Sequence, residues 1–200
     1  MDKKLLPKKF FRDNPLDMSS AQVIACFSGL MSNNDEYQEE MEKSIKRKLD
    51  SEELALLNEE RAEILAFETG PEIVKYIRGG INILNYAMLS QKILTMQDEV
   101  MPLLLRRYLT SSLDSVIESV MYVLLNDNAD PQYVDQLIAD YSKIRNPYAQ
   151  SMACVVFGAQ QREELLPLLL REYERLMREY PEENYCQGPL MAIYAICGEG

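Results

Sequence analysis

Residues 100–108 of this chain read VMPLLLRRY, and residues 165–173 read LLPLLLREY. The closing tyrosines of both segments belong to a series of four, Tyr76, Tyr108, Tyr141 and Tyr173, spaced 32, 33 and 32 residues apart. An aliphatic residue stands three positions before each of them, at Ile73, Leu105, Ile138 and Leu170. Apolar residues at helical offsets that return with a fixed period of this size predict stacked pairs of helices.

A second apolar run follows each tyrosine after a short break, at residues 81–93, 113–125, 148–157 and 190–196. Each unit is therefore predicted to be helix, turn, helix. A single hairpin of this kind cannot bury both of its apolar faces, so it must stack on neighbours. We expect about four such hairpins over residues 69–200, within one all-α domain of residues 1–200.

The part of the chain before the repeats is predicted to form helices over residues 17–68. Capping boxes mark two helix starts, one at Ser19 with Gln22 and one at Asp50 with Glu53, and apolar residues at helical spacing indicate a further helix over residues 35–49. Residues 1–16 contain two prolines, five basic residues and no clear period. We expect this basic tip to be a tail or a docking arm.

The two quoted segments resemble the first helix of HEAT repeats, which carries a proline near its start. This resemblance covers residues 69–200, and it implies a right-handed α-α superhelix preceded by an N-terminal helical cap. In HEAT-like stacks the second helices line the concave side, which often binds peptides or helices of partner proteins. Armadillo and tetratricopeptide arrays are related α-hairpin stacks and stay open as alternatives.

The composition argues against several classes of function. The net charge is −11, and thirteen carboxylates against five basic residues lie between Asp35 and Glu72, whereas nucleic-acid binding needs a cationic surface. The chain has no histidine, CxxC motif or glycine-rich phosphate loop. The loop at residues 126–130 is similar to a calcium loop, but Pro131 and Leu137 replace the required glycine and glutamate. We therefore predict no catalytic residue, no cofactor and no metal site.

Localisation is predicted from what the sequence lacks. No run of about 18 uncharged apolar residues predicts a membrane span, and the N-terminus has no apolar signal core. The four cysteines show no paired spacing, which is typical of reduced thiols in a cytoplasmic protein. No feature of the sequence specifies an oligomeric state.

The predicted binding surface lies on the second helices. Tyr86, Glu118 and Ser151 share the offset +10 from their repeat tyrosines, and Ser90, Tyr122 and Val155 share the offset +14. Offsets four apart lie on one helical face, and Tyr194 is expected to continue the row. We predict that this stripe binds a protein or peptide that carries basic residues around an apolar anchor.

Two alternative functions stay open. One is a HEAT-like DNA-processing enzyme resembling alkylpurine glycosylases, which the acidic charge and the absence of tryptophan disfavour. The other is contact of the basic N-terminal tip with an anionic membrane surface.

Overall fold

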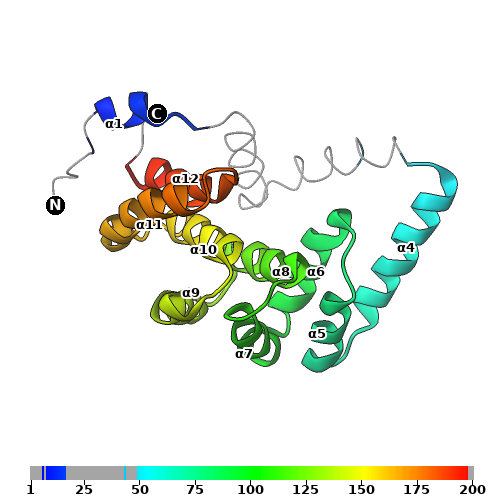
Figure 1. Ribbon diagram of the computed structural model, residues 1–200. Helices are drawn as coiled ribbons and strands as arrows, with labels where there is room; N and C mark the ends of the chain where they lie inside the picture. Colours follow the sequence, from blue (N-terminus) through cyan, green and yellow to red (C-terminus); the bar gives the residue numbers. More distant parts are fainter. Residues whose placement is uncertain (1–5, 7, 17–42, 44–48, 198–200) are drawn as a thin grey trace.

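The computed structural model describes residues 6, 8–16, 43 and 49–197, and all regular structure within these residues is helical. Two rows of helices pack on each other, and Figure 1 shows the helices of the second row side by side across the molecule. The first row consists of α5 (Gly70–Arg78), α7 (Gln97–Tyr108), α9 (Pro131–Asp140) and α11 (Leu166–Glu179). The second row consists of α4 (Ser51–Ala66), α6 (Tyr86–Leu94), α8 (Asp114–Leu124), α10 (Pro147–Ala159) and α12 (Gln187–Cys197). The all-α prediction is confirmed for these residues.

Shorter elements complete the chain. Among the described residues, helix α1 (Lys8–Asp13) precedes the rows, and four 3₁₀ turns follow, η1 (Ile83–Asn85), η2 (Tyr141–Lys143), η3 (Glu163–Leu165) and η4 (Asn184–Cys186). The predicted capping box at Ser19, the helix over residues 35–49 and the thiol of Cys26 lie outside the described residues.

The predicted helix starts agree with the observed ones because they depend on local hydrogen bonds. Asp50 accepts bonds from the backbone of Glu52 and Glu53, both at 2.9 Å, and Glu53 accepts one from the Asp50 backbone, also at 2.9 Å. This capping box opens α4, as predicted. The side chains of Asp130 and Asn146, each followed by a proline, likewise cap α9 and α10 by accepting a backbone hydrogen bond.

The predicted turn at Gly79 and Gly80 separates α5 from η1. Gly80 has φ +95°, a conformation that L side chains rarely adopt, so glycine suits this position. The chain then reaches α6 through η1.

The apolar positions of the repeat are buried to different extents. Ile73 and Leu105 are fully buried, as expected three positions before a repeat tyrosine, whereas Ile138 and Leu170 are only half-buried. In the first repeat, α5 begins only at Gly70, so the positions seven and four residues before Tyr76 fall at its N-terminus. Thr69 and Glu72 stand there and form a capping box, which explains why this copy of the pattern is weak.

Helix α4 covers the N-terminal end of the stack with one face only. Leu57 and Ile64 are buried, while Leu65 is 62% exposed. The difference arises because α4 packs mainly against α6 and η1, and no other described helix makes extensive contact with its outer side. The buried Asn85 fixes this contact, donating to Glu60 at 2.5 Å and accepting from Arg61 at 3.2 Å.

The repeat tyrosines join successive repeats through their hydroxyl groups. Tyr108 donates to the Ala149 carbonyl at 2.6 Å, and Tyr141 donates to Glu172 at 2.9 Å. Both rings are at least 90% buried, so these tyrosines have a structural role in the stack.

Helices α10 and α12 approach each other closely through small residues. A Cβ atom on Gly158 would lie 2.3 Å from the Cα of Ala192, and one on Gly188 would lie 2.3 Å from the backbone oxygen of Ser151. No side chain fits at either contact, so glycine at both positions sets the distance between these helices.

Candidate functional site

A row of tyrosines and carboxylates crosses the second helices, and we call Tyr86, Tyr122, Tyr148, Tyr185 and Glu118 together the tyrosine row. Tyr86 is the first residue of α6, and its ring stacks on that of Tyr122 from α8, with centroids 5.0 Å apart and planes 7° from parallel. Tyr86 is buried and Tyr122 is half-buried. The structure thus brings these two predicted residues into direct contact.

Glu118 connects α8 to the next helix of the row. Its carboxylate accepts a hydrogen bond from the hydroxyl of Tyr148 at 3.2 Å. Burial, followed by the charge of Glu118, raises the pKa of the Tyr148 phenol above its ordinary value. Burial and a hydrogen bond with Glu118 likewise raise the pKa of Tyr86. Both phenols are therefore neutral near pH 7, and neither is a general base there.

The tyrosine row continues toward the C-terminal end of the stack. The ring of Tyr148 lies 6.4 Å from that of Tyr185 in η4, and Tyr180 lies 5.6 Å from Tyr185 in an edge-on arrangement. Burial raises the pKa of Tyr185, and the charges of Glu183 and Asp114 add to this effect. Half-buried aromatic rings with carboxylates beside them form the exposed part of the row.

Three of these tyrosines were not among the predicted site residues. Tyr148 stands one helical turn before Ser151, so its position on α10 could have placed it on the same face. Tyr180 and Tyr185 lie in the connection between α11 and α12, where the repeat gives no signal. Their contact with Tyr148 depends on the path of that connection.

Besides Tyr86, which is 4% exposed, three predicted residues lie inside the helix packing instead of on a surface. Ser90 is 5% exposed and donates to the Ala87 carbonyl at 2.8 Å. Ser151 is 1% exposed, against Gly188, and Val155 is 7% exposed. The prediction that these side chains contact a partner is corrected by their burial, because the close approach of α12 covers α10, and α6 packs tightly on α8.

Tyr194 does not continue the tyrosine row, because α1 covers it. Its hydroxyl lies 3.1 Å from the backbone oxygen of Phe11 and 3.0 Å from that of Asn14. Its ring meets the Phe11 ring edge-on, with centroids 4.8 Å apart. We call residues 8–16, which pack here against α12, the docking arm.

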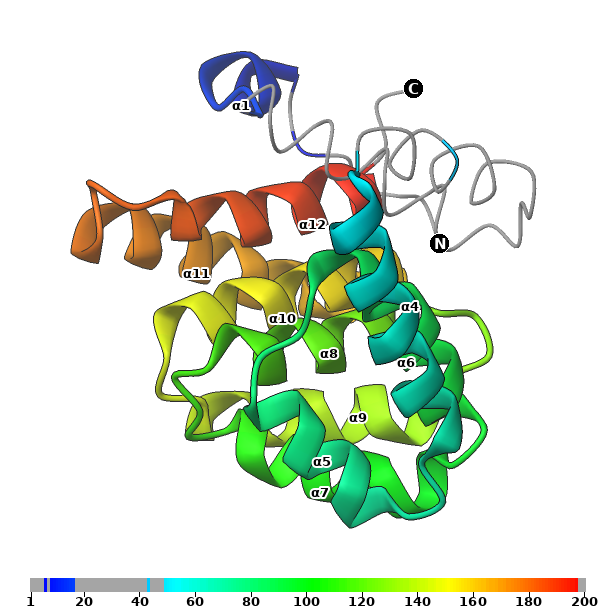
Figure 2. The same ribbon diagram turned by 90° about the vertical axis from the view of Figure 1, so that its right-hand side faces the viewer.

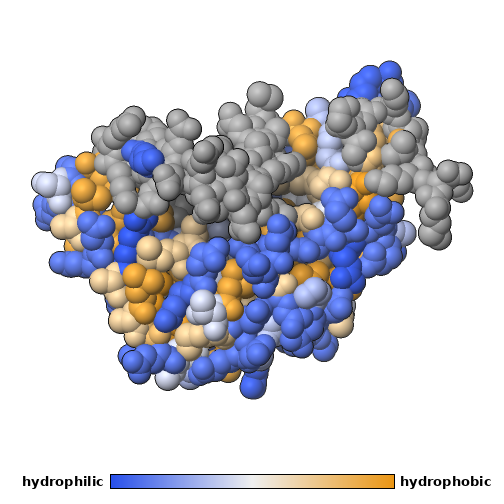
Figure 3. All heavy atoms as spheres, turned by 180° about the vertical axis from the view of Figure 1, so that it is seen from behind, coloured by the Kyte–Doolittle hydropathy of each residue, from blue (hydrophilic) through white to orange (hydrophobic). Residues whose placement is uncertain are grey.

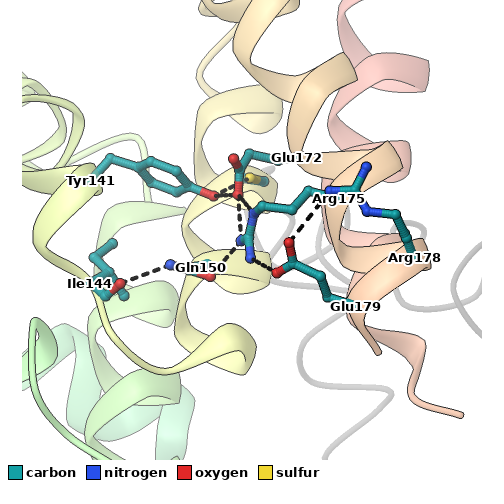
Figure 4. A network of polar contacts seen from close by, with 8 residues as sticks. Tyr141, Ile144, Gln150, Glu172, Arg175, Arg178 and Glu179 are labelled. Carbon is teal, nitrogen blue, oxygen red and sulfur yellow. Dashed lines mark hydrogen bonds and ion pairs between the residues drawn. The ribbon is translucent and has the colours of Figure 1, made fainter. Parts of the chain in front are cut away.

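A second polar cluster joins η2, α10 and α11 (Figure 4). Arg175 donates to Glu172 at 2.7 Å, to Glu179 at 2.8 Å and to Gln150 at 2.6 Å, and Glu172 also accepts the hydroxyl of Tyr141. Every charged group in this cluster has a partner, so it holds helices together rather than presenting reactive groups.

Cys154 touches this cluster but is not an activated nucleophile. Burial raises the pKa of its thiol to about 12, and the side chain is fully buried. The thiol is therefore protonated near pH 7 and shielded from substrate. The described cysteines, Cys154, Cys186 and Cys197, form no disulfide.

The molecular surface seen from behind carries hydrophobic residues in several separate patches among hydrophilic ones (Figure 3). None of the helices in the described part of the chain has the length and apolar character that crossing a membrane requires.

No family model, curated protein or solved structure matches the chain. Its function therefore has to follow from its own geometry.

Proposed function

We propose that this chain is a non-enzymatic interaction scaffold that binds a peptide or a helix of a partner protein along the tyrosine row. The tyrosine row runs over α6, α8, α10 and η4, and its members Tyr122, Tyr148 and Tyr185 are half-buried. Aromatic side chains of this kind supply large contact area at a low cost in conformational entropy, and they are enriched among the residues that dominate binding energy. This connected row is the observation that carries the proposal.

The proposed architecture is a HEAT-like α-hairpin stack with the second helices on its concave side. The two rows of helices and the inter-repeat bonds of Tyr108 and Tyr141 support it. In this arrangement a partner lies across successive second helices. The carboxylates Asp114 and Glu118 beside the tyrosines favour a partner with basic residues around an apolar anchor.

The experiment compares capture by the full chain and by its Tyr122→Ala/Tyr148→Ala double variant. Both proteins are immobilised and exposed to lysate of the source cells, to DNA and to anionic vesicles. We expect a protein that the native chain retains and the double variant loses. Each anchoring aromatic contributes about 2 kcal/mol, which is roughly thirtyfold in affinity. Tyr86 is left intact because its burial makes it part of the fold.

Met177→Ala is the matched control, because this side chain is 46% exposed on α11 and belongs to no part of the tyrosine row. Circular dichroism melting establishes that each variant is folded. Equal retention of the partner by the folded double variant would place the binding surface elsewhere. Retention of DNA or vesicles in place of a protein would favour one of the two alternative functions.

A further inference from the structure

The docking arm packs aromatic side chains onto the C-terminal end of the stack. Phe10 meets Tyr173 edge-on with ring centroids 6.2 Å apart, and Phe11 meets Tyr194 in the same way at 4.8 Å. The two phenylalanines also contact each other at 5.4 Å. Phe11 is 7% exposed, so this is a buried aromatic cluster made from the two ends of the chain. Figures 1 and 2 show α1 lying beyond α12.

Polar contacts fix the end of α1 against the same surface. The last carbonyls of a helix lack intrahelical partners, and here the hydroxyl of Tyr194 lies within donating distance of the backbone oxygens of Phe11 and Asn14. The hydroxyl of Tyr173 donates to the side-chain oxygen of Asn14 at 2.9 Å, while the amide of Asn14 donates back to the Phe10 carbonyl at 2.8 Å. The site therefore recognises both the side chains and the C-terminus of a short helix.

The arm occupies the place that a further repeat would take. Tyr108 and Tyr141 each donate a hydroxyl hydrogen bond to the repeat that follows, at Ala149 and Glu172. Tyr173 is the equivalent residue of the last repeat, and its acceptor is Asn14 of the arm. The last repeat has no following repeat to accept the hydroxyl hydrogen bond that Tyr108 and Tyr141 make, and the short helix α1 supplies the acceptor instead.

Short helices of this length are unstable by themselves. The six residues of α1 fall well below the roughly 12–15 residues that an isolated helix needs in water. The helix is therefore held by its contacts with Tyr173 and Tyr194. The chain connects it covalently to α4, so its contact with Tyr173 and Tyr194 is intramolecular, which favours it over a free helix. A free helix with the same side chains makes the same contacts, in competition with the tethered one.

We propose that Tyr173 and Tyr194 form a second peptide-binding site, separate from the tyrosine row, which α1 occupies in cis. Its ligand is a short helix with two adjacent aromatic residues followed three positions later by asparagine, as in Phe10, Phe11 and Asn14. Lys9 and Arg12 are not part of this recognition, because their side chains are each 74% exposed.

The experiment uses a fluorescent synthetic peptide of residues 6–16 and the full chain as receptor. Fluorescence anisotropy measures its binding to the native chain and to the Phe10→Ala/Phe11→Ala double variant, whose arm no longer fills the site. We expect the double variant to bind the peptide at least tenfold more tightly. In the native chain the docked arm reduces the fraction of receptor that is competent to bind.

Tyr194→Phe, added to the double variant, tests the position of the site. It removes the hydroxyl that faces Phe11 and Asn14 while it keeps the ring, and we expect at least threefold weaker binding. Tyr133→Phe in the same background is the matched control, because its hydroxyl also contacts two oxygens, at Gln97 and Asp98, away from the arm. The control is expected to bind like the double variant.

Three results would overturn the proposal: no binding to the folded double variant, equal binding to the native chain and the double variant, or a native dimer in analytical ultracentrifugation that the double variant abolishes. The last result would assign the arm to a second copy of the chain. If the double variant does not melt cooperatively, Phe10→Ala alone replaces it, because Phe10 is only half-buried and Phe11 then stays in place.

Discussion

The two ends of the helix stack are completed in different ways. At the N-terminal end, α4 is continuous with the repeats and packs on α6 through buried Leu57 and Ile64. At the C-terminal end, α12 packs tightly on α10, and a separate short helix from the start of the chain covers Tyr173 and Tyr194. The first end is thus closed by a long helix next in sequence, and the second by an arm that is about 160 residues away in sequence.

The two ends differ in whether the helix that covers them can detach while the rest of the chain stays folded. A helix of sixteen residues with buried aliphatic side chains is part of the cooperative core. A six-residue helix held by two phenylalanines and a few hydrogen bonds can open while the rest stays folded. The C-terminal end is therefore the place where a partner can replace a part of the chain itself.

The largest expected effect concerns the close packing beneath the C-terminal end. Gly158→Val should destabilise the fold by at least about 3 kcal/mol, because the new side chain overlaps the backbone of α12 at Ala192. Chemical denaturation monitored by circular dichroism measures this loss. Ala159→Val, one residue further on the same helix and half-buried, is the control and should cost less than about 1 kcal/mol. Similar losses in both variants would show that α12 can move away without penalty.

A matched pair of truncations compares the two ends directly. Ile64→Ala should lower the free energy of unfolding by about 3 kcal/mol, as is usual for a fully buried aliphatic side chain in a cooperative core. Phe11→Ala should lower it by only about 1 kcal/mol, because the loss is limited to the free energy that holds the arm in place.

Hydrogen exchange provides the second measurement for this pair. In Phe11→Ala, amide protection should fall over residues 8–16 and stay unchanged over α5 to α8. A loss of protection throughout the chain would mean that the arm is part of the global folding unit, and the contrast between the two ends would disappear.

The smallest expected effect concerns the hydroxyl of Tyr76 near α4. This hydroxyl is buried without a hydrogen-bond partner, unlike those of Tyr108, Tyr141 and Tyr173. Tyr76→Phe removes an unsatisfied polar group, so stability at pH 7 should stay the same or rise by up to about 1 kcal/mol. Tyr173→Phe, which removes a hydroxyl with a partner, should lower stability by a similar amount.

The Tyr76→Phe variant should also change the stability at alkaline pH. Burial, with smaller contributions from Glu60 and Glu63, raises the pKa of Tyr76 to about 12 from an ordinary value of 10.0. Between these two values the unfolded phenol has lost its proton while the folded one keeps it, so stability falls as pH rises from 10 to 12. Denaturation midpoints measured across this range should fall less steeply in Tyr76→Phe than in the native chain. Parallel pH curves would contradict the raised pKa.

The sequence predicted the local features well because each depends on neighbouring residues. The capping box of Asp50 and Glu53 appears where expected. The period of the tyrosines indicated equivalent places in successive repeats. Two of the four hydroxyls join one unit to the next, and that of Tyr173 joins the last unit to the docking arm. These features follow from helical geometry and from hydrogen bonds made within a few residues of each helix terminus.

The candidate site was predicted only in part. The shared offsets predicted that Tyr86, Glu118 and Tyr122 lie together. These residues do lie together, because equivalent positions on successive second helices are side by side. The same offsets placed Ser151 and Val155 on a surface, although α12 covers them. Equal offsets do not give equal exposure, because exposure depends on the distance to the next helix. At this position that distance is set by Gly188, which stands 37 residues after Ser151.

The amino-acid sequence by itself determined the helices, their caps and the repeat that aligns the tyrosines, because all of these arise from the period of the α-helix and from contacts close along the chain. Only the tertiary structure decided which equivalent positions stay exposed and which residues complete the ends of the stack. The pairing of Phe10 and Phe11 with Tyr173 and Tyr194 is an example, since it joins residues from opposite ends of the sequence. Contacts of this kind depend on how all the intervening helices pack on one another, and no local sequence pattern predicts that packing.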